Sequence, residues 1–98
     1  MNITTKKENT TFTVALEGRL DTTTAPELDV FAEKELANTQ ELALDFADLE
    51  YISSAGLRVL LKLQKVMNKK GSMKLIHVGD VVKEVFEITG FTDILTIE

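Results

Sequence analysis

The chain has 98 residues, which is enough for one ordinary domain and too few for two. Hydrophobic residues make up 44% and charged residues 28% of it, the balance of a folded globular protein, and no apolar run approaches the roughly 20 residues that a membrane-spanning helix needs. The absence of cysteine excludes thiol and disulfide chemistry, and a net charge of −5 disfavours direct binding to nucleic acid.

The first third of the chain predicts a hairpin followed by a helix. Phe12, Val14 and Leu16 alternate with small or polar residues, which is typical of a strand with one buried face, and residues 3–6 are expected to pair with it as an antiparallel hairpin. Thr24, followed by Pro and Glu two and three positions later, is a capping-box pattern that predicts a helix start. The buried side of this helix would consist of Leu28, Phe31, Ala32 and Leu36.

The remaining two thirds of the chain predict strands and helices in alternation. They are a strand at 42–46, a helix that includes the apolar residues of 57–67, Val66 among them, and ends at Gly71, a strand at 73–78, a third helix and a strand at 94–97. Asp80 is expected to cap the third helix, and Gly90 to end it in a left-handed conformation. Strands separated by helices need crossover connections, so most of the sheet should be parallel. The sequence therefore predicts one α/β domain over residues 1–98, with helices packed on a mixed, mostly parallel sheet of about five strands that begins with an antiparallel hairpin.

The N-terminal residues Met1 to Lys7 lack the apolar core and the cleavage site of an export signal. We therefore expect a cytoplasmic protein with no membrane partner. No phosphate-binding glycine loop, dinucleotide fingerprint or zinc-ligand spacing occurs, so we expect neither a cofactor nor a metal.

The stretch from Asp45 to Leu61 is the most informative part of the sequence. An apolar strand ends there, Ser53 and Ser54 follow, and a helix begins at once. Helix starts leave backbone N–H groups unpaired and carry a partial positive charge. A serine hydroxyl placed there can cap the helix, and it can also carry a phosphate without unfolding it. From the residues alone, a purely structural role for both serines stays open.

Two segments of the chain resemble a known family. Ser53-Ser54-Ala55-Gly56-Leu57, with Asp48-Leu49 before it and an apolar helix after it, resembles the signature of the STAS domain in bacterial anti-sigma factor antagonists. Gly18-Arg19-Leu20-Asp21 is similar to a shorter family segment at the end of an early strand. Both segments stand in the family's order and spacing, and the resemblance covers essentially the whole chain.

The resemblance implies a site of phosphorylation. The family's phosphorylated serine stands two positions before the glycine of the Gly-Leu pair, which corresponds to Ser54. Many antagonists carry Asp directly before that serine, whereas this chain has Ser53, which becomes a second possible acceptor. The expected partner surface consists of Asp21, Ser53, Ser54, Gly56, Leu57 and Arg58.

The function that the resemblance implies is that of a regulatory binding module, not an enzyme. In its unphosphorylated form such a protein binds an anti-sigma factor and so releases a sigma factor, which regulates transcription indirectly. The anti-sigma factor would also be a serine protein kinase that uses ATP to phosphorylate Ser54, and a metal-dependent serine phosphatase would reverse the reaction. The ATP and the metal would belong to these partners.

Two other functions stay open at this point. One is a constitutive scaffold of the same fold, in a signalling or lipid-trafficking assembly, in which the serine is never modified. The other is a small serine hydrolase in which His77, expected in the strand 73–78, activates Ser54, although no carboxylate can be placed to orient the ring.

Some charged residues also have simpler explanations. Asp21 and Asp48 are both explained as turn-forming residues. A basic stripe recurs at helical spacing in the second predicted helix and is either a solvated helix face or a contact for an acidic partner surface. It consists of Arg58, Lys62, Lys65 and Lys69.

Overall fold

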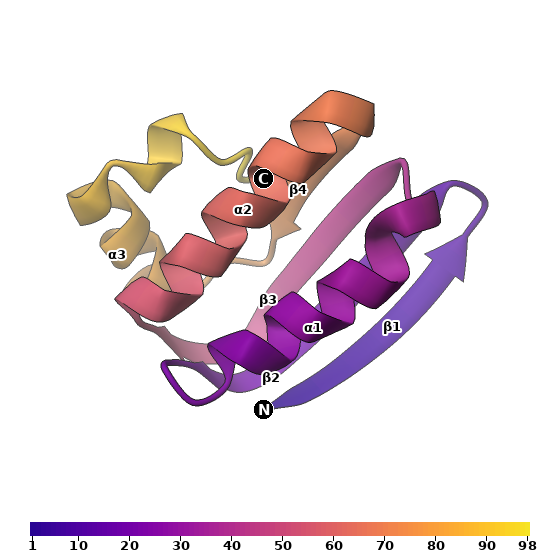
Figure 1. The fold of residues 1–98 in the computed structure, drawn as a ribbon. Helices are drawn as coiled ribbons and strands as arrows, with labels where there is room; N and C mark the ends of the chain where they lie inside the picture. The colour runs from indigo at the N-terminus through magenta and orange to yellow at the C-terminus, as the bar shows by residue number, and fades with distance from the viewer.

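The computed structural model describes all of residues 1–98 as one sheet with helices packed against it (Figure 1). The elements in chain order are β1 (Asn2–Glu8), β2 (Thr11–Leu20), α1 (Ala25–Glu35), η1 (Leu36–Asn38), β3 (Glu41–Ile52), α2 (Ser54–Lys70), β4 (Ser72–Ile76), α3 (Asp80–Thr89) and η2 (Phe91–Asp93), where η marks a short 3-10 helix. Helices α1 and α2 lie side by side over the sheet, and α3 lies beyond α2 (Figure 1). No helix is both long and apolar enough to cross a membrane.

The sheet confirms the predicted α/β class and its mixed topology. The strand order is β1-β2-β3-β4, with β1 and β2 antiparallel and the other two pairs parallel. The fifth strand predicted at 94–97 is reduced to a single bridge between Ile97 and Leu75. A full strand does not form because the chain is still in a turn at its start, where the N–H of Leu95 donates to the carbonyl of Phe91. Only the last few residues reach β4.

The core lies between the sheet and the helices. The parallel register places Val14 beside Leu44 and Leu44 beside Leu75, so alternate residues of three strands point to the same side and are buried there. Helix α2 covers them with one apolar face, made of Leu57, Leu60, Leu63 and Met67, while α1 adds Leu28 and Ala32 and η1 adds Leu36. The predicted hydrophobic positions are therefore core positions with few exceptions, of which Val66 is the clearest, at 39% exposed.

The start of α1 differs from the predicted capping box. Thr24 already has helical backbone angles, and its hydroxyl donates to the carbonyl of Arg19 at 2.7 Å instead of capping α1. The cap is Asp21, whose Oδ1 accepts the N–H groups of Thr23 and Thr24 at 3.0 and 3.1 Å. Residues 22–24 form a turn directly before α1. The first N–H groups that need a cap are therefore those of this turn, and they lie closer to the Asp21 side chain than to that of Thr24.

The residues that begin α3 and end α2 and α3 differ in part from the predicted ones. Gly79, not Asp80, is the N-cap of α3, and Asp80 is its first helical residue. Gly90 ends α3 with the predicted left-handed conformation, at φ 80°. Gly71 ends α2 in an extended conformation, and a side chain there would overlap the carbonyl of Gln40, so the need for glycine comes from a close approach of two chain segments.

Candidate functional site

The serine junction, which we define as residues Ile52 to Gly56, connects the end of β3 to the start of α2. Strand β3 is longer than predicted and runs to Ile52. Asp48 therefore lies within β3, exposed and opposite Glu17 of β2, and the prediction that it is a loop residue was wrong. The strand continues because β2 continues beside it, with irregular register near Glu17 and Arg19 that interrupts the simple alternation of side chains.

The two serines of the junction have different environments. Ser53 is half-buried and extended, with φ −102° and ψ 175°, and its Oγ accepts the N–H of Gly56 at 3.5 Å, as an N-cap does. Its own N–H donates to the carbonyl of Leu20 at 2.9 Å, which ties the junction to the end of β2. Ser54 is the first residue of α2, its side chain is exposed, and its hydroxyl makes no hydrogen bond to another protein group.

The start of α2 leaves hydrogen-bond donors available beside Ser54. The earliest backbone bond of the helix joins the N–H of Leu57 to the carbonyl of Ser53. The N–H groups of Ser54 and Ala55 precede this bond and are the unpaired donors of the helix start. A negative group attached to the Ser54 oxygen would therefore lie where α2 presents free N–H groups and the positive end of its dipole.

The two segments that resemble the family are brought together by the sheet. Asp21 follows Leu20 directly, and Leu20 is the residue that accepts the Ser53 N–H. The Thr24 N–H contributes most to lowering the pKa of the Asp21 carboxyl, the Thr23 N–H, the Thr24 hydroxyl and the Arg19 guanidinium add to this, and desolvation opposes it. Much of the Asp21 carboxylate is thus committed to the start of α1, beside the serine junction.

Arg19 and Tyr51 form a contact next to the serine junction that was not predicted from the sequence. The Arg19 guanidinium carbon lies 4.2 Å from the centre of the Tyr51 ring, and Arg19 Nε lies 3.8 Å from Asp21 Oδ2. The pairing follows from the register of β2 and β3, which places Arg19 opposite Tyr51. Because that register is shifted on both sides of Gly18, no sequence pattern could have indicated it.

Gly56 and Leu57 lie under the surface of the junction. A side chain at Gly56 would approach Leu20 Cγ within 2.8 Å and Ile52 Cγ1 within 2.9 Å, so the first turn of α2 rests directly on the strand ends. Leu57 is 6% exposed and belongs to the core. Because they are buried, Gly56 and Leu57 cannot contact a partner directly. They can contribute to the predicted partner surface only by positioning the exposed residues Ser54 and Arg58.

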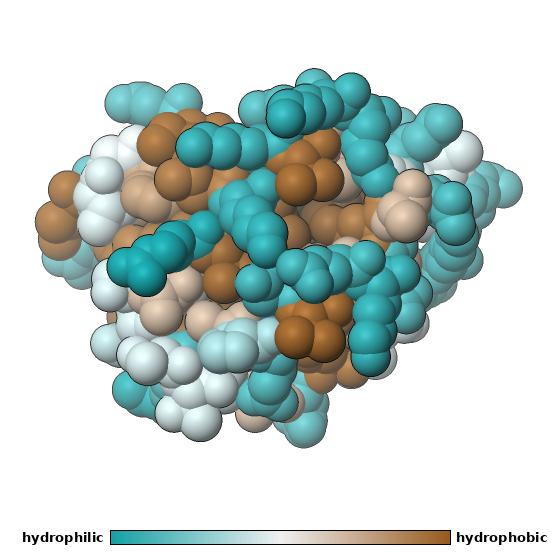
Figure 2. Space-filling view, in the orientation of Figure 1, coloured by the Kyte–Doolittle hydropathy of each residue, from teal (hydrophilic) through white to brown (hydrophobic).

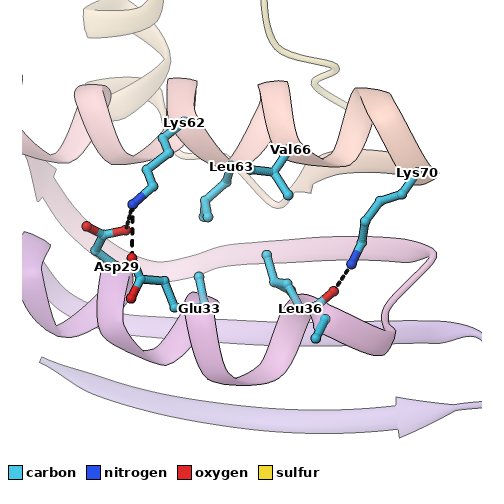
Figure 3. Close-up of a pocket in the computed structure, with 9 residues that line it drawn as sticks. Asp29, Glu33, Leu36, Lys62, Leu63, Val66 and Lys70 are labelled. Carbon is cyan, nitrogen blue, oxygen red and sulfur yellow. Dashed lines mark hydrogen bonds and ion pairs between the residues drawn. The ribbon is translucent and has the colours of Figure 1, made fainter.

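The basic stripe does not behave as one unit. Lys62 Nζ lies 2.8 Å from Asp29 Oδ1 and 3.2 Å from Glu33 Oε1 of α1 (Figure 3), and these hydrogen bonds, the one to Asp29 first, raise the pKa of Lys62. Lys62 therefore joins the two helices. Arg58, Lys65 and Lys69 have no carboxylate within 4 Å; they are exposed and their charges are free for other contacts.

Two hollows lie along the line where α1 and α2 meet. One, of about 300 Å³, is at the helix starts and is lined by Pro26 of α1 and by Ala55 and Arg58 of α2, among others. The other, of about 230 Å³, lies beyond the Lys62 bridge, where Leu63 and Val66 form part of an apolar floor (Figure 3). Hydrophobic residues show between hydrophilic ones on this side of the molecule (Figure 2).

The geometry does not provide the Ser54–His77 pair of a hydrolase. Strand β4 ends at Ile76, and His77 has a left-handed backbone with φ 57°. Its Nδ1 lies 3.0 Å from Asp45 Oδ1, and its ring makes no hydrogen bond to either serine. The predicted position of His77 inside the strand was wrong, because the backbone turns at this residue. No three carboxylate or imidazole groups lie together in a way that could hold a metal ion.

The sequence matches the STAS domain family over residues 2–98. BtrV of Bordetella bronchiseptica, a proposed anti-sigma factor antagonist, is 33% identical over 99% of this chain and 85% of its own length. The anti-sigma-B factor antagonist of Staphylococcus aureus is 28% identical over 97% of this chain and 90% of its own length.

A solved structure with the same fold supports this match. The crystal structure of an anti-sigma factor antagonist from Mycobacterium paratuberculosis has a TM-score of 0.89, with 20% sequence identity, and the similarity covers 98% of this chain and 83% of that one. Both the sequence match and the fold extend over nearly all of the chain. The protein therefore belongs to the STAS domain family.

Proposed function

We propose that the protein is an anti-sigma factor antagonist that binds an anti-sigma factor through the unphosphorylated serine junction and thereby frees a sigma factor. The observation that carries the proposal is the exposed Ser54 hydroxyl, which begins α2 without a hydrogen-bond partner while Ser53 makes the cap. Relatives that align over nearly the whole chain are described as antagonists of this kind, which supports the same role here.

In the proposed mechanism, phosphorylation of Ser54 dissociates the complex. A phosphoserine adds about 1.5 to 2 negative charges and three strong acceptor oxygens. The free N–H groups at the start of α2 favour such a group, so the fold is expected to survive the modification. A partner packed on the serine junction would then have to desolvate the phosphate, and without a matching cation that cost disfavours binding.

Ser54 is the better acceptor of the two serines for a structural reason. A kinase must reach the hydroxyl, and the Ser54 side chain is exposed whereas Ser53 is half-buried. Ser53 also accepts the Gly56 N–H and donates its own N–H to Leu20, so modification there would disturb the connection between the strand ends and α2. We therefore keep Ser54 as the phosphorylation site and Ser53 as the second choice.

The remaining parts of the mechanism belong to the partners. The protein is a regulatory binding protein and not an enzyme. We propose that the anti-sigma factor is itself the serine protein kinase, that ATP binds to it, and that a serine phosphatase with its own metal restores the active form. We propose that the protein acts in the cytoplasm, where these partners regulate transcription.

The experiment is a capture of partners from cells of the source organism with four baits: wild type, Ser54→Ala, Ser54→Asp and Ser72→Asp. We expect wild type and Ser54→Ala to retain an ATP-binding protein kinase that Ser54→Asp loses. Ser72→Asp is the matched control, because it makes the same change at an exposed serine that begins β4, outside the expected partner surface, so it should retain the partner. Recovery of the same partner by all four baits would contradict the proposal and favour a constitutive scaffold.

A further inference from the structure

We propose that Arg58 is the counter-ion of a phosphate on Ser54, so that phosphorylation withdraws an arginine from the partner surface as well as adding negative charge. This inference rests on the proposed phosphorylation of Ser54 and adds the means by which the protein itself responds to it. It concerns two residues of one helix, Ser54 and Arg58, both exposed in the first turns of α2.

The spacing of the two residues brings their side chains together. Residues four apart on a helix are neighbours on its surface and are separated by about 6 Å along the helix axis. Side chains of a helix lean toward its N-terminus, which brings a phosphate on Ser54 within reach of the long side chain of Arg58. An acidic group that precedes a basic group by four residues is also the more favourable of the two possible orders.

Arg58 is also the cation that is free to make this contact. It has no carboxylate within 4 Å, whereas Lys62 is held by Asp29 and Glu33 on α1. Lys65 is on the same side of α2 but stands eleven residues after Ser54, about 16 Å along the helix. Arg19 lies against the Tyr51 ring and near Asp21, so it is already engaged.

The chemistry of the pair favours arginine over lysine. A guanidinium group is planar and presents several N–H donors in a fork that matches two phosphate oxygens at once. In the unphosphorylated protein Arg58 lines the hollow between the helix starts, where its guanidinium group can donate hydrogen bonds to a carboxylate of the partner. A phosphate on Ser54 and a carboxylate of the partner therefore compete for one guanidinium group.

The test uses protein with phosphoserine genetically encoded at position 54, so that no kinase is required. The second pKa of the phosphate, ordinarily near 6, is measured by ³¹P NMR titration in wild type, Arg58→Gln, Arg58→Lys and Lys65→Gln, at about 0.1 M salt. A nearby cation favours the dianion and lowers this pKa. We expect the wild-type value to lie below that of Arg58→Gln by about 0.3 unit or more, with Arg58→Lys between them.

Lys65→Gln is the matched control, since it removes the same charge from the same side of the helix but beyond the screening length. Its phosphate pKa should equal that of wild type. Equal values in wild type and Arg58→Gln, or an equal rise in both glutamine variants, would overturn the inference. Circular dichroism confirms that each variant is folded, which is expected because both residues are exposed.

This measurement needs no partner, so its result is independent of the capture experiment above. A shifted pKa together with baits that all retain the partner would leave the Arg58 pairing standing and refute the proposed switch. If the switch holds, its dependence on Arg58 is a further readout. The ratio of dissociation constants between phosphorylated and unphosphorylated protein should then be smaller in Arg58→Gln than in wild type.

Discussion

The replacement Gly56→Ala tests whether the serine junction depends on the close approach of α2 to the ends of β2 and β3. A methyl group at this position would lie 2.8 Å from Leu20 Cγ, 2.9 Å from Ile52 Cγ1 and 3.0 Å from the Leu20 carbonyl oxygen. All three distances are shorter than ordinary contacts, and the third partner is backbone that cannot move away alone. The helix or the strand ends must therefore shift.

Two opposing effects decide the size of the loss. Alanine is favoured over glycine inside a helix by about 1 kcal/mol, and overpacking of a core position costs about 1 to 3 kcal/mol. We expect the overpacking to win, because three neighbours are affected, and the free energy of unfolding to fall by about 1 kcal/mol. For a domain of this size that corresponds to a melting temperature lower by about 4 to 8 °C.

The assay is urea unfolding followed by circular dichroism, carried out as a double-mutant cycle with Leu20→Ala. The second substitution removes the nearest atom, Leu20 Cγ, so Gly56→Ala should cost less in that background than in wild type. Should Gly56→Ala be as stable as wild type, or cost the same with and without the Leu20 side chain, the close packing that we describe at the start of α2 would be refuted.

Four other outcomes follow from the same contacts. Gly71→Ala should destabilise more than Gly56→Ala in the same urea assay, because its methyl group would overlap the Gln40 backbone carbonyl; an equal or smaller loss would contradict this. Ser53→Ala should lower the free energy of unfolding by about 0.5 to 1 kcal/mol through loss of the cap, whereas Ser54→Ala should change it by less than about 0.5 kcal/mol, and the reverse order would contradict the assignment of the two serines. The pKa of Asp21 is lowered in the folded protein, so its contribution to stability is present above the ordinary value of 3.8 and is lost as the pH falls through the folded pKa; the difference in stability between wild type and Asp21→Asn should shrink over that range. Lys62→Met should remove a stabilising contribution that declines as salt rises, and a loss independent of salt would show that the bridge between α1 and α2 acts by packing alone.

Much of the fold could be predicted because the apolar residues follow simple periods. The alternation of Phe12, Val14 and Leu16 and the buried face of α2 both appear in the structure as the patterns indicate. The prediction was wrong about the bounds of β3 because its buried residues Phe46, Leu49 and Ile52 are three apart. That spacing arises where the register with β2 shifts, and a register shift leaves no mark that can be read from one strand alone.

The candidate site shows the same limit. The sequence pattern placed a serine at a helix start but could not decide which serine caps it, because either hydroxyl can reach an N–H of the first turn. The cap at Asp21 could have been found, since Asp followed by three threonines is typical of a turn in which the carboxylate accepts the N–H groups two and three residues later. The contacts of Arg19 with Tyr51 and of Lys62 with α1 join distant segments and needed the structure.

The central claim is that the Ser54 hydroxyl carries a removable phosphate. It is tested most directly by site-resolved mass spectrometry of the protein isolated from cells of the source organism grown under several conditions. We predict that a phosphoryl group is found on Ser54, in a fraction that varies with the growth condition. Peptides that cover the serine junction but never carry phosphate, or carry it on Ser53 alone, would contradict the account.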